Sequence, residues 1–494
     1  MDVSIAIAQA ETIHTRVERE RKAANPHAAL LRTFRNYARG YQKGTLTTKQ
    51  QDILRGVTGN RFSDNVCKMV LLAATGRLQL ARFEVADKTV EEWLKELWTL
   101  ASMPLFSNQV HWAALRDGNH AVSLSWDNEK GQVRFSREKW WDGKSGIFIS
   151  YDHRDQPEYA VKEWKDARKR LRRVIWWPDR IERYVADGNG WRPFTLSEEG
   201  DWKQAWVDAS GQPLGLPVVH FRNIYMPNDS SDDDADSAYG VSELDGGVLG
   251  LQDEINDVQR DLTSGGRYTG YQMLWGTGIT LDENPDGTKK PLKVEPGAFF
   301  TSQTADARYG TLAAGDLSQL ERLLNVKLRA VSRMTSTPLH QITGGDWPSG
   351  EALLRADQPL VSKAVAIGGS FGPSWSSLMH KATLLANAFG QETLDTAALI
   401  TAVFHAPDKS DALTQSKIAD GVSKHVSQRE VLRVLGKGPE QQDQIFEEIE
   451  EEKKKAQEMA VANQAAMAAV TPPTTGTGAA GESSVGGKQE KEGA

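Results

Sequence analysis

Residues 242–264 read SELDGGVLGLQDEINDVQRDLTS, residues 317–333 read LSQLERLLNVKLRAVSR, and residues 351–367 read EALLRADQPLVSKAVAI. In each segment apolar residues recur every three or four positions, which is the spacing of an amphipathic helix with one buried stripe. We therefore expect three helices here. Ser242, with Asp245 three residues later, has the pattern of a capping box and predicts the start of the first helix. Gly265 and Gly266 predict its end.

The first two helices differ in charge. The first carries acidic residues against a single basic one, Arg260: they include Asp245, Asp253, Glu254, Asp257 and Asp261. The second carries four basic residues, Arg322, Lys327, Arg329 and Arg333, against Glu321. Helices of about 20 residues are near 30 Å long, so two of opposite charge can pack along each other, within one chain or between copies. An ordinary helical hairpin with solvated outer faces is the alternative. The residues predicted to pair between subunits are Asp253, Asp257, Asp261, Lys327, Arg329 and Arg333.

Short motifs in this region resemble those of tailed-bacteriophage portal proteins, the head–tail connectors of the long-tailed siphophage type. YGVSEL at 239–244, followed by LQDEIN at 251–256, resembles the entry to the family's stem. TPLHQI at 337–342, then GG at 344–345 and PSGEAL at 348–353, is similar to its stem exit, tunnel loop and tunnel helix. The order of the motifs matches too, and the likeness covers about residues 30–455.

The resemblance implies an α+β protein with the portal fold: a mixed α/β wing, a two-helix stem, a small α/β clip, a long kinked tunnel helix and a helical crown. Pro359 and the glycines after it fit the kink. The implied parts are an N-terminal arm (1–25), the first part of the wing (26–240), stem helix 1 (241–264), the clip (265–316), stem helix 2 (317–336), the tunnel loop region (337–350), the tunnel helix with the second part of the wing (351–407), the crown (408–468) and a disordered tail (469–494).

Local patterns outside the stem predict the elements of the wing. Gly368, Gly369, Gly372 and Pro373 are expected to interrupt the third helix before the pattern resumes at 375–389. Helices are predicted at 30–41, from 66 to 72, at 90–100 and at 108–115. Strands are predicted near 83–85 and at 121–126, 147–151, 158–164, 173–177, 181–185, 218–221, 270–275 and 399–404.

Composition bounds the class of protein. The chain has 494 residues and a formal net charge of −7, which argues against a globally basic grip on nucleic acid. Its single cysteine, Cys67, excludes an internal disulfide framework, and we expect a small buried residue there, with a reactive thiol as the alternative. No run of 18 apolar residues occurs, so we expect no membrane span and a soluble protein of a reducing compartment.

Three polar or aromatic clusters have two interpretations each. The basic run from Lys165 to Arg173 is a solvated turn or a phosphate patch. The acidic run from Asp229 to Asp236 is a flexible linker or a cation site. Most tryptophans lie between Trp93 and Trp206, where they fill a core or form a stacking platform for single strands. In each case we favour the first interpretation.

Motifs of catalysis are missing from the sequence. The nucleotide-binding GxxxxGK[ST] pattern, HExxH and CxxC do not occur. His340, Asp346 and Ser349 could be read as a hydrolase triad, but Ser349 has no nucleophile elbow around it. We therefore predict no enzymatic activity, catalytic residue, cofactor or metal.

The function implied by the resemblance is a ring of twelve identical subunits at one capsid vertex. Double-stranded DNA would enter and leave through its channel, with the terminase large subunit and a head-completion adaptor docking on the clip and major capsid and scaffold proteins around the wing. The protein would belong to the virion, and to the host cytoplasm during assembly. A DNA-processing enzyme with an unrecognised metal site and a non-viral helical scaffold protein are the alternatives.

Two sets of residues follow from the same resemblance. The tunnel loop would consist of Thr343, Gly344, Gly345, Asp346, Trp347, Pro348 and Ser349. The clip would present Tyr271, Trp275, Asp286, Lys289 and Lys290.

Overall fold

The structure is a computed structural model. It describes residues 13–21, 28–42, 64–188, 190–195, 201–224, 239–270, 274–278, 285–288, 306–311, 316–344, 350–390 and 392–405, with four isolated positions beyond. The chain forms two compact units, Met1–Lys409 and Ser410–Ala494. The predicted crown, apart from those four positions, lies outside the described residues, as do the predicted tail and the acidic run from Asp229 to Asp236. The helices and strands named below lie in the first unit.

Two antiparallel sheets form most of the β part of an α/β lobe, which we define as residues 28–224 with the long helix and last strand described below. The predicted strands of this lobe are confirmed, whereas β3, β8 and β9 were not predicted. One sheet has the order β4 (Gly146–Tyr151), β5 (Pro157–Lys165), β6 (Leu171–Trp176), β7 (Arg180–Asp187) and β8 (Gly190–Pro193), with β9 (Lys203–Ala205) also on β7. The other has the order β10 (Val218–Arg222), β2 (Asn119–Asp127) and β3 (Gln132–Glu138).

Three helices of the lobe begin within two residues of their predicted positions: α2 (Ala28–Ala38), α4 (Val66–Arg77) and α5 (Lys88–Leu100). The fourth, α6 (Met103–Asp117), begins before its predicted start at residue 108. The side chains of Asn65 and Asp87 cap α4 and α5 by accepting hydrogen bonds from the backbone N–H groups of Lys68 and Val90, in the first turn of each helix. Of the tryptophans between Trp93 and Trp206, Trp140 and Trp206 are buried in the core, in line with the preferred interpretation for these two residues.

The basic run from Lys165 to Arg173 does not behave as one solvated turn. Arg168 and Lys169 are exposed in the turn between β5 and β6, as predicted. Arg172 and Arg173 lie within β6 and are buried, so the prediction was wrong for them. Arg173 donates hydrogen bonds to Glu163 and Glu18, because a buried guanidinium requires carboxylate partners.

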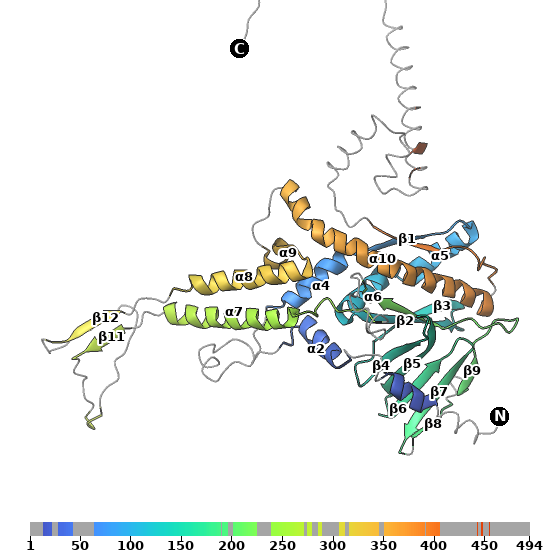
Figure 1. The fold of residues 1–494 in the computed structure, drawn as a ribbon, viewed down its shortest axis with the longest axis horizontal. Helices are drawn as coiled ribbons and strands as arrows, with labels where there is room; N and C mark the ends of the chain where they lie inside the picture. Colours follow the sequence, from blue (N-terminus) through green and yellow to red (C-terminus); the bar gives the residue numbers. More distant parts are fainter. Residues whose placement is uncertain are drawn as a thin grey trace, which may run out of the picture. The chain divides into compact units, whose positions relative to one another are not determined.

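The two helices of the central region pair as predicted, but the first has different ends. Helices α7 (Val248–Gly270) and α8 (Ser318–Thr335) lie side by side in Figure 1. Ser242 does not cap α7, since Gly246 and Gly247 adopt left-handed φ angles of 68° and 94° and break the backbone first.

Gly265 and Gly266 do not end α7 either. A Cβ on Gly265 would lie 2.8 Å from the Leu317 side chain, so this glycine allows a close approach to the residue that precedes α8. Its function is therefore packing, and the helix continues to Gly270.

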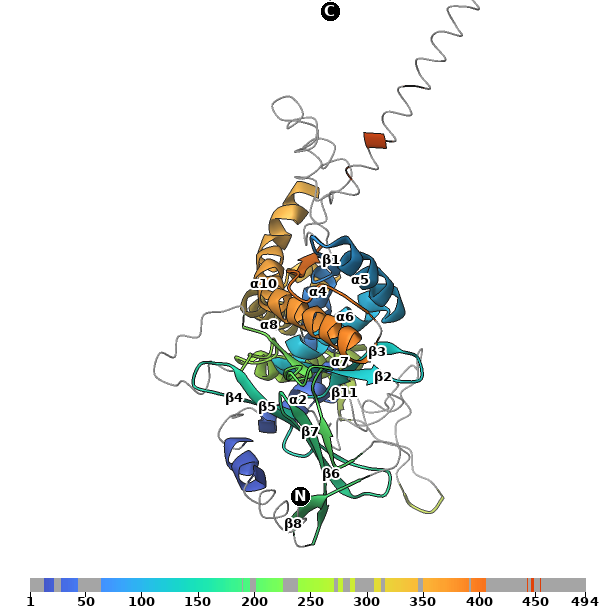
Figure 2. The same ribbon diagram turned by 90° about the vertical axis from the view of Figure 1, so that its right-hand side faces the viewer.

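The third helix is longer than the sequence predicted. After the short helix α9 (Leu339–Thr343), α10 runs from Gly350 to Phe389 through Pro359 and Pro373 without a break. Four residues that contact the core, Ile367, Phe371, Trp375 and Leu378, stabilise it across the glycines, so the predicted interruption at 368–373 was wrong. Figure 2 shows that α10 changes direction along its length, as prolines within a helix cause.

Two small antiparallel ladders complete the described fold. Strand β13 (Thr401–Phe404) pairs with β1 (Leu80–Glu84) beside α10. Between α7 and α8 in the chain, β11 (Leu274–Thr277) pairs with β12 (Arg308–Thr311). Every strand pair is antiparallel and helices and strands are not regularly alternating, which makes the described unit an α+β fold.

Candidate assembly interface on the paired helices

The contact between α7 and α8 is apolar and rests on the lobe. Ile255 of α7 meets Leu328 and Val331 of α8, and Val66 and Val70 of α4 complete this cluster. Each of these side chains is less than one-tenth exposed. Burial of one such side chain contributes about 1.5–3 kcal/mol, so the pair is anchored on α4.

A second side of α7 faces the lobe through polar groups. Gln252 accepts a hydrogen bond from the backbone N–H of Cys67 and donates to the carbonyl of Asp64, at 3.0 and 2.6 Å. Asn256 donates to Gln42 at 2.6 Å. Both side chains are buried and fully engaged, which sets the position of α7 along α4.

Cys67 is buried beside this polar contact, as predicted. Burial, and then the nearby carboxylate of Asp253, raises the pKa of its thiol to about 12. The thiol therefore stays protonated and has little nucleophilic character at neutral pH.

The exposed side of α7 is acidic. Glu254, Asp257 and Asp261 are exposed and follow a spacing of three and four residues, so they form one stripe. Glu254 pairs with Lys327 of α8 at 2.5 Å, and Asp257 pairs with Arg260 on its own helix. Asp261 has no ion pair or hydrogen bond with another described residue.

The exposed side of α8 is basic with apolar residues among the charges. Arg322, Val326, Arg329 and Arg333 are exposed at intervals of four, three and four residues. The three arginines make no ion pair or hydrogen bond within the described part of the chain. Leu323 and Met334, which are 41% and 48% exposed, flank the stripe. We call these residues of α8 the basic stripe, and Glu254, Asp257 and Asp261 the acidic stripe.

Four of the six residues predicted to pair between subunits thus lie on exposed stripes: Asp257, Asp261, Arg329 and Arg333. The other two are used within the chain. Lys327 bonds to Glu254, and Asp253 accepts hydrogen bonds from the Tyr37 hydroxyl, 2.8 Å from both carboxylate oxygens.

A buried ion pair joins the base of the helix pair to α10 and the lobe. The Lys363 ammonium of α10 contacts the Glu243 carboxylate and donates to the carbonyl of Thr335, in the last turn of α8, at 2.8 Å. Glu243 also accepts from Asn223 at 3.0 Å. A positive charge at a helix C-terminus is favourable. This site was not predicted from the sequence, although a lysine within an apolar stripe could have indicated it.

The loop before α10 is described only in part. Thr343 ends α9, where its hydroxyl donates to Leu339, and Gly344 follows with a left-handed φ of 66°. The other predicted loop residues, Gly345 to Ser349, lie outside the described residues. His340 lies 3.2 Å from Asp357 of α10, which also pairs with Arg77 at 2.5 Å, so this histidine already has a structural carboxylate partner.

Two of the predicted clip residues are described. Trp275 of β11 is 43% exposed and lies opposite Gly310 of β12, where an added Cβ would be 2.6 Å from the indole nitrogen. Asp286 accepts two hydrogen bonds from Thr288, which hold the pKa of its carboxyl below the usual value. Tyr271, Lys289 and Lys290 lie outside the described residues.

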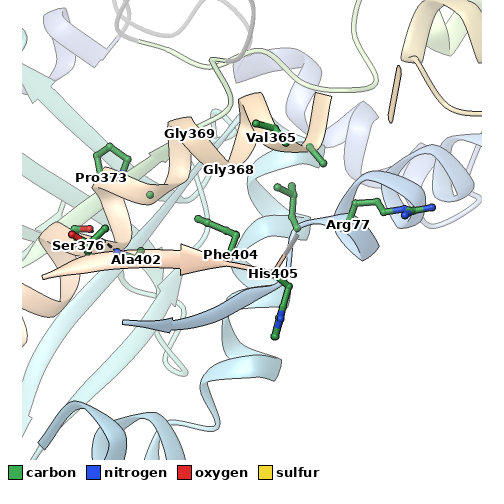
Figure 3. A pocket seen from close by; sticks show the side chains of 13 residues that line it. Arg77, Val365, Gly368, Gly369, Pro373, Ser376, Ala402, Phe404 and His405 are labelled. Carbon is green, nitrogen blue, oxygen red and sulfur yellow. Dashed lines mark hydrogen bonds between the residues drawn. The ribbon is translucent and has the colours of Figure 1, made fainter. Parts of the chain in front are cut away.

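A shallow apolar pocket of about 520 Å³ lies where α10 passes over β13. Figure 3 shows Phe404 of β13 turned towards the turn of α10 that contains Gly368 and Gly369. Arg77 and His405 lie at one end of the pocket. The Phe404 ring would be 3.7 Å from a Cβ on Gly368, so the glycine allows β13 to approach the helix closely.

Comparison with known proteins adds no assignment. No family model matches the chain, and no curated protein is significantly similar to it. None of the helices in the described ranges combines the length and apolar character needed to cross a bilayer.

Proposed function

We propose that this protein is a portal protein: a homo-oligomeric ring at one vertex of a phage capsid, through which double-stranded DNA enters during packaging and leaves during ejection. The order of elements supports the proposal. An α/β lobe leads into a helix, a two-stranded insertion, a second helix paired with the first, a short helix and a 40-residue helix that returns to the lobe. In this proposal the lobe is the wing, the helix pair is the stem and α10 is the tunnel helix.

The two stripes of opposite charge are the observation that carries the proposal. Each helix pair presents an acidic stripe on α7 and a basic stripe on α8, and the arginines of the latter lack partners within the described chain. Complementary surfaces on one subunit favour head-to-tail contact between copies, which closes into a ring when the rotation permits. The net charge of −7 suits a channel that contacts DNA without holding it, because each phosphate contact adds affinity that resists sliding.

The partners follow from the same proposal. The terminase large subunit and the head-completion adaptor would dock at the β11–β12 ladder, where Trp275 offers an exposed aromatic side chain. Major capsid and scaffold proteins would surround the lobe, and the protein would reside at the portal vertex of the virion.

Charge reversal tests the stripes. We expect the double variant Arg329→Glu/Arg333→Glu to assemble poorly, because like charges would then face each other at every subunit contact. An exposed ion pair contributes only about 0.2–1 kcal/mol, but the loss is repeated around the ring. Native mass spectrometry measures the ring fraction, and negative-stain microscopy shows whether a central hole is present.

A compensating variant makes the test specific. Adding Asp257→Arg and Asp261→Arg to the double variant exchanges the two stripes and should restore rings. Reversal of two other exposed basic residues, Lys165 at the end of β5 and Arg168 in the β5–β6 turn, is the matched control and should leave assembly unchanged. If the stripe reversal left the rings unchanged, the proposed contact between the stripes would be refuted, but the portal function would not. A wild-type chain that forms no closed ring would refute the portal function and favour an unrelated scaffold.

A further inference from the structure

A second pocket, of about 830 Å³, lies between β10, the turn from β4 to β5, and α10. Much of its wall is apolar and comes from all three elements. The apolar residues of the wall include Ile149, Pro157, Val218, Ile224 and Pro373. The charged groups on its wall are Asp155, Arg222 and Lys381.

On one side of the pocket, two serine hydroxyls of α10 cover a sheet edge. Strand β10 is the edge of its sheet. On the side that faces β2, the carbonyl of Pro217 accepts from Leu124 and the N–H of Asn223 donates to Gly118, so the carbonyls of His220 and Arg222 face outward. Ser374 and Ser370 donate to these two carbonyls at 2.7 Å each. These two carbonyls are thus satisfied, and the protons of the two serine hydroxyls are not free for a ligand.

Two polar groups on the wall offer no net charge to a ligand: Arg222 is neutralised by a carboxylate, and His220 is uncharged. Arg222 forms a double contact with Asp155 at 3.1–3.2 Å. His220 lies 2.6 Å from the Tyr151 hydroxyl and 3.0 Å from the Asn119 oxygen. Burial and the nearby Arg222 hold the pKa of His220 well below its usual value, so the imidazole is uncharged.

Lys381 is the charge that remains. It is half-buried, and its ammonium has no hydrogen bond or ion pair with any residue that the structure describes. The Nζ atom lies close to the loop before β10, 3.5 Å from where a Cβ on Gly215 would be. Burial lowers its pKa. An ammonium withdrawn from water without a counter-ion is unfavourable, and an anion beside it would remove that cost.

We propose that this pocket binds an organic anion, a carboxylate or phosphate carried on an apolar body, with the charged end on Lys381 and the body against the apolar wall. The site is independent of the proposed portal function. A carboxylate would come from a metabolite or a chain terminus and a phosphate from a monoester, and the experiment separates the two.

Calorimetric titration of the full-length protein with four six-carbon probes tests the site. We expect hexanoate or hexyl phosphate to bind about tenfold or more tightly than hexanol, since a charge-assisted hydrogen bond contributes at least that factor. Hexylamine should not bind. The tighter of the two anions identifies the source.

Two variants of Lys381 and one of an exposed lysine elsewhere supply the controls. Lys381→Met keeps the length of the side chain without the charge, and should weaken the preferred anion to the level of hexanol. Lys381→Arg keeps the charge and should retain the preference for an anion. Lys88→Met, at an exposed lysine on α5, should change nothing. Equal affinity for hexanol and both anions, no saturable binding of any probe, or undiminished anion binding in Lys381→Met would each overturn the proposal.

Discussion

His111 shows how burial sets the chemistry of a single residue in the lobe. Its Nε2 accepts a hydrogen bond from the Trp375 indole at 2.8 Å, so Nδ1 carries the proton and faces the Leu78 carbonyl at 2.9 Å. The ring is fully buried. Burial lowers the pKa of His111 to about 4, although the Leu78 contact opposes that shift. The neutral imidazole is therefore part of the core.

This shift predicts loss of stability in acid. Because the pKa of His111 is lower in the folded than in the unfolded chain, the stabilisation from burying its neutral imidazole is complete above about pH 6.5. This stabilisation is lost as the pH falls towards 4. The shift corresponds to about 3 kcal/mol. We expect the difference in unfolding free energy between wild type and His111→Gln to shrink by about that amount between pH 7 and pH 4, measured by urea denaturation. For His153→Gln, at an exposed position, a similar change would contradict the assignment to His111.

At the scale of elements, glycine has opposite roles in α7 and α10. Gly247 lies just before α7 with a φ of 94°, a conformation that residues with a Cβ rarely adopt. Gly369 lies inside α10, is exposed, and an added Cβ would meet nothing within 4 Å. The same substitution should therefore change stability in opposite directions at the two positions.

We expect Gly369→Ala to stabilise the protein by about 0.5–1 kcal/mol, because alanine is favoured over glycine inside a helix. Gly247→Ala should destabilise it by about 1–2 kcal/mol through the left-handed backbone. Chemical denaturation of both variants measures the two signs. If Gly369→Ala brought no gain, α10 would be interrupted near this residue, as the sequence pattern had indicated.

At the scale of the whole molecule, Lys363 and Glu243 connect four segments of the chain. The ion pair joins α10 to the segment before α7, and its further bonds reach Thr335 of α8 and Asn223 after β10. Both charged side chains are nearly inaccessible to water. Removing one partner of such a pair leaves a buried charge without compensation.

Lys363→Met should accordingly destabilise the protein by about 3–5 kcal/mol. Adding Glu243→Gln should recover part of this loss, because the unpaired carboxylate is then removed. Urea denaturation with and without the second substitution gives the coupling energy, with Lys88→Met as an exposed control. Additive losses in the double variant would show that the two side chains do not act as a pair.

Periodicity alone was sufficient where local spacing and burial agree. The apolar repeat at 317–333 predicted helix α8, which occupies Ser318–Thr335, and eight strands of the lobe were found from alternation and turn residues. The charge difference between α7 and α8 was also visible in the sequence. The exposure of Asp257, Asp261, Arg329 and Arg333 follows from their positions opposite the apolar stripes.

Tertiary contacts decided the features that local spacing left open. Glycines and prolines predicted a break at 368–373, but contacts of α10 with the core and with β13 hold one continuous helix. Asp253 and Lys327 matched the charge pattern, yet each has a partner within the chain, and the pairing of Lys363 with Glu243 spans 120 residues. A sequence determines which side chains prefer burial; which groups meet there depends on segments that only the folded chain brings together.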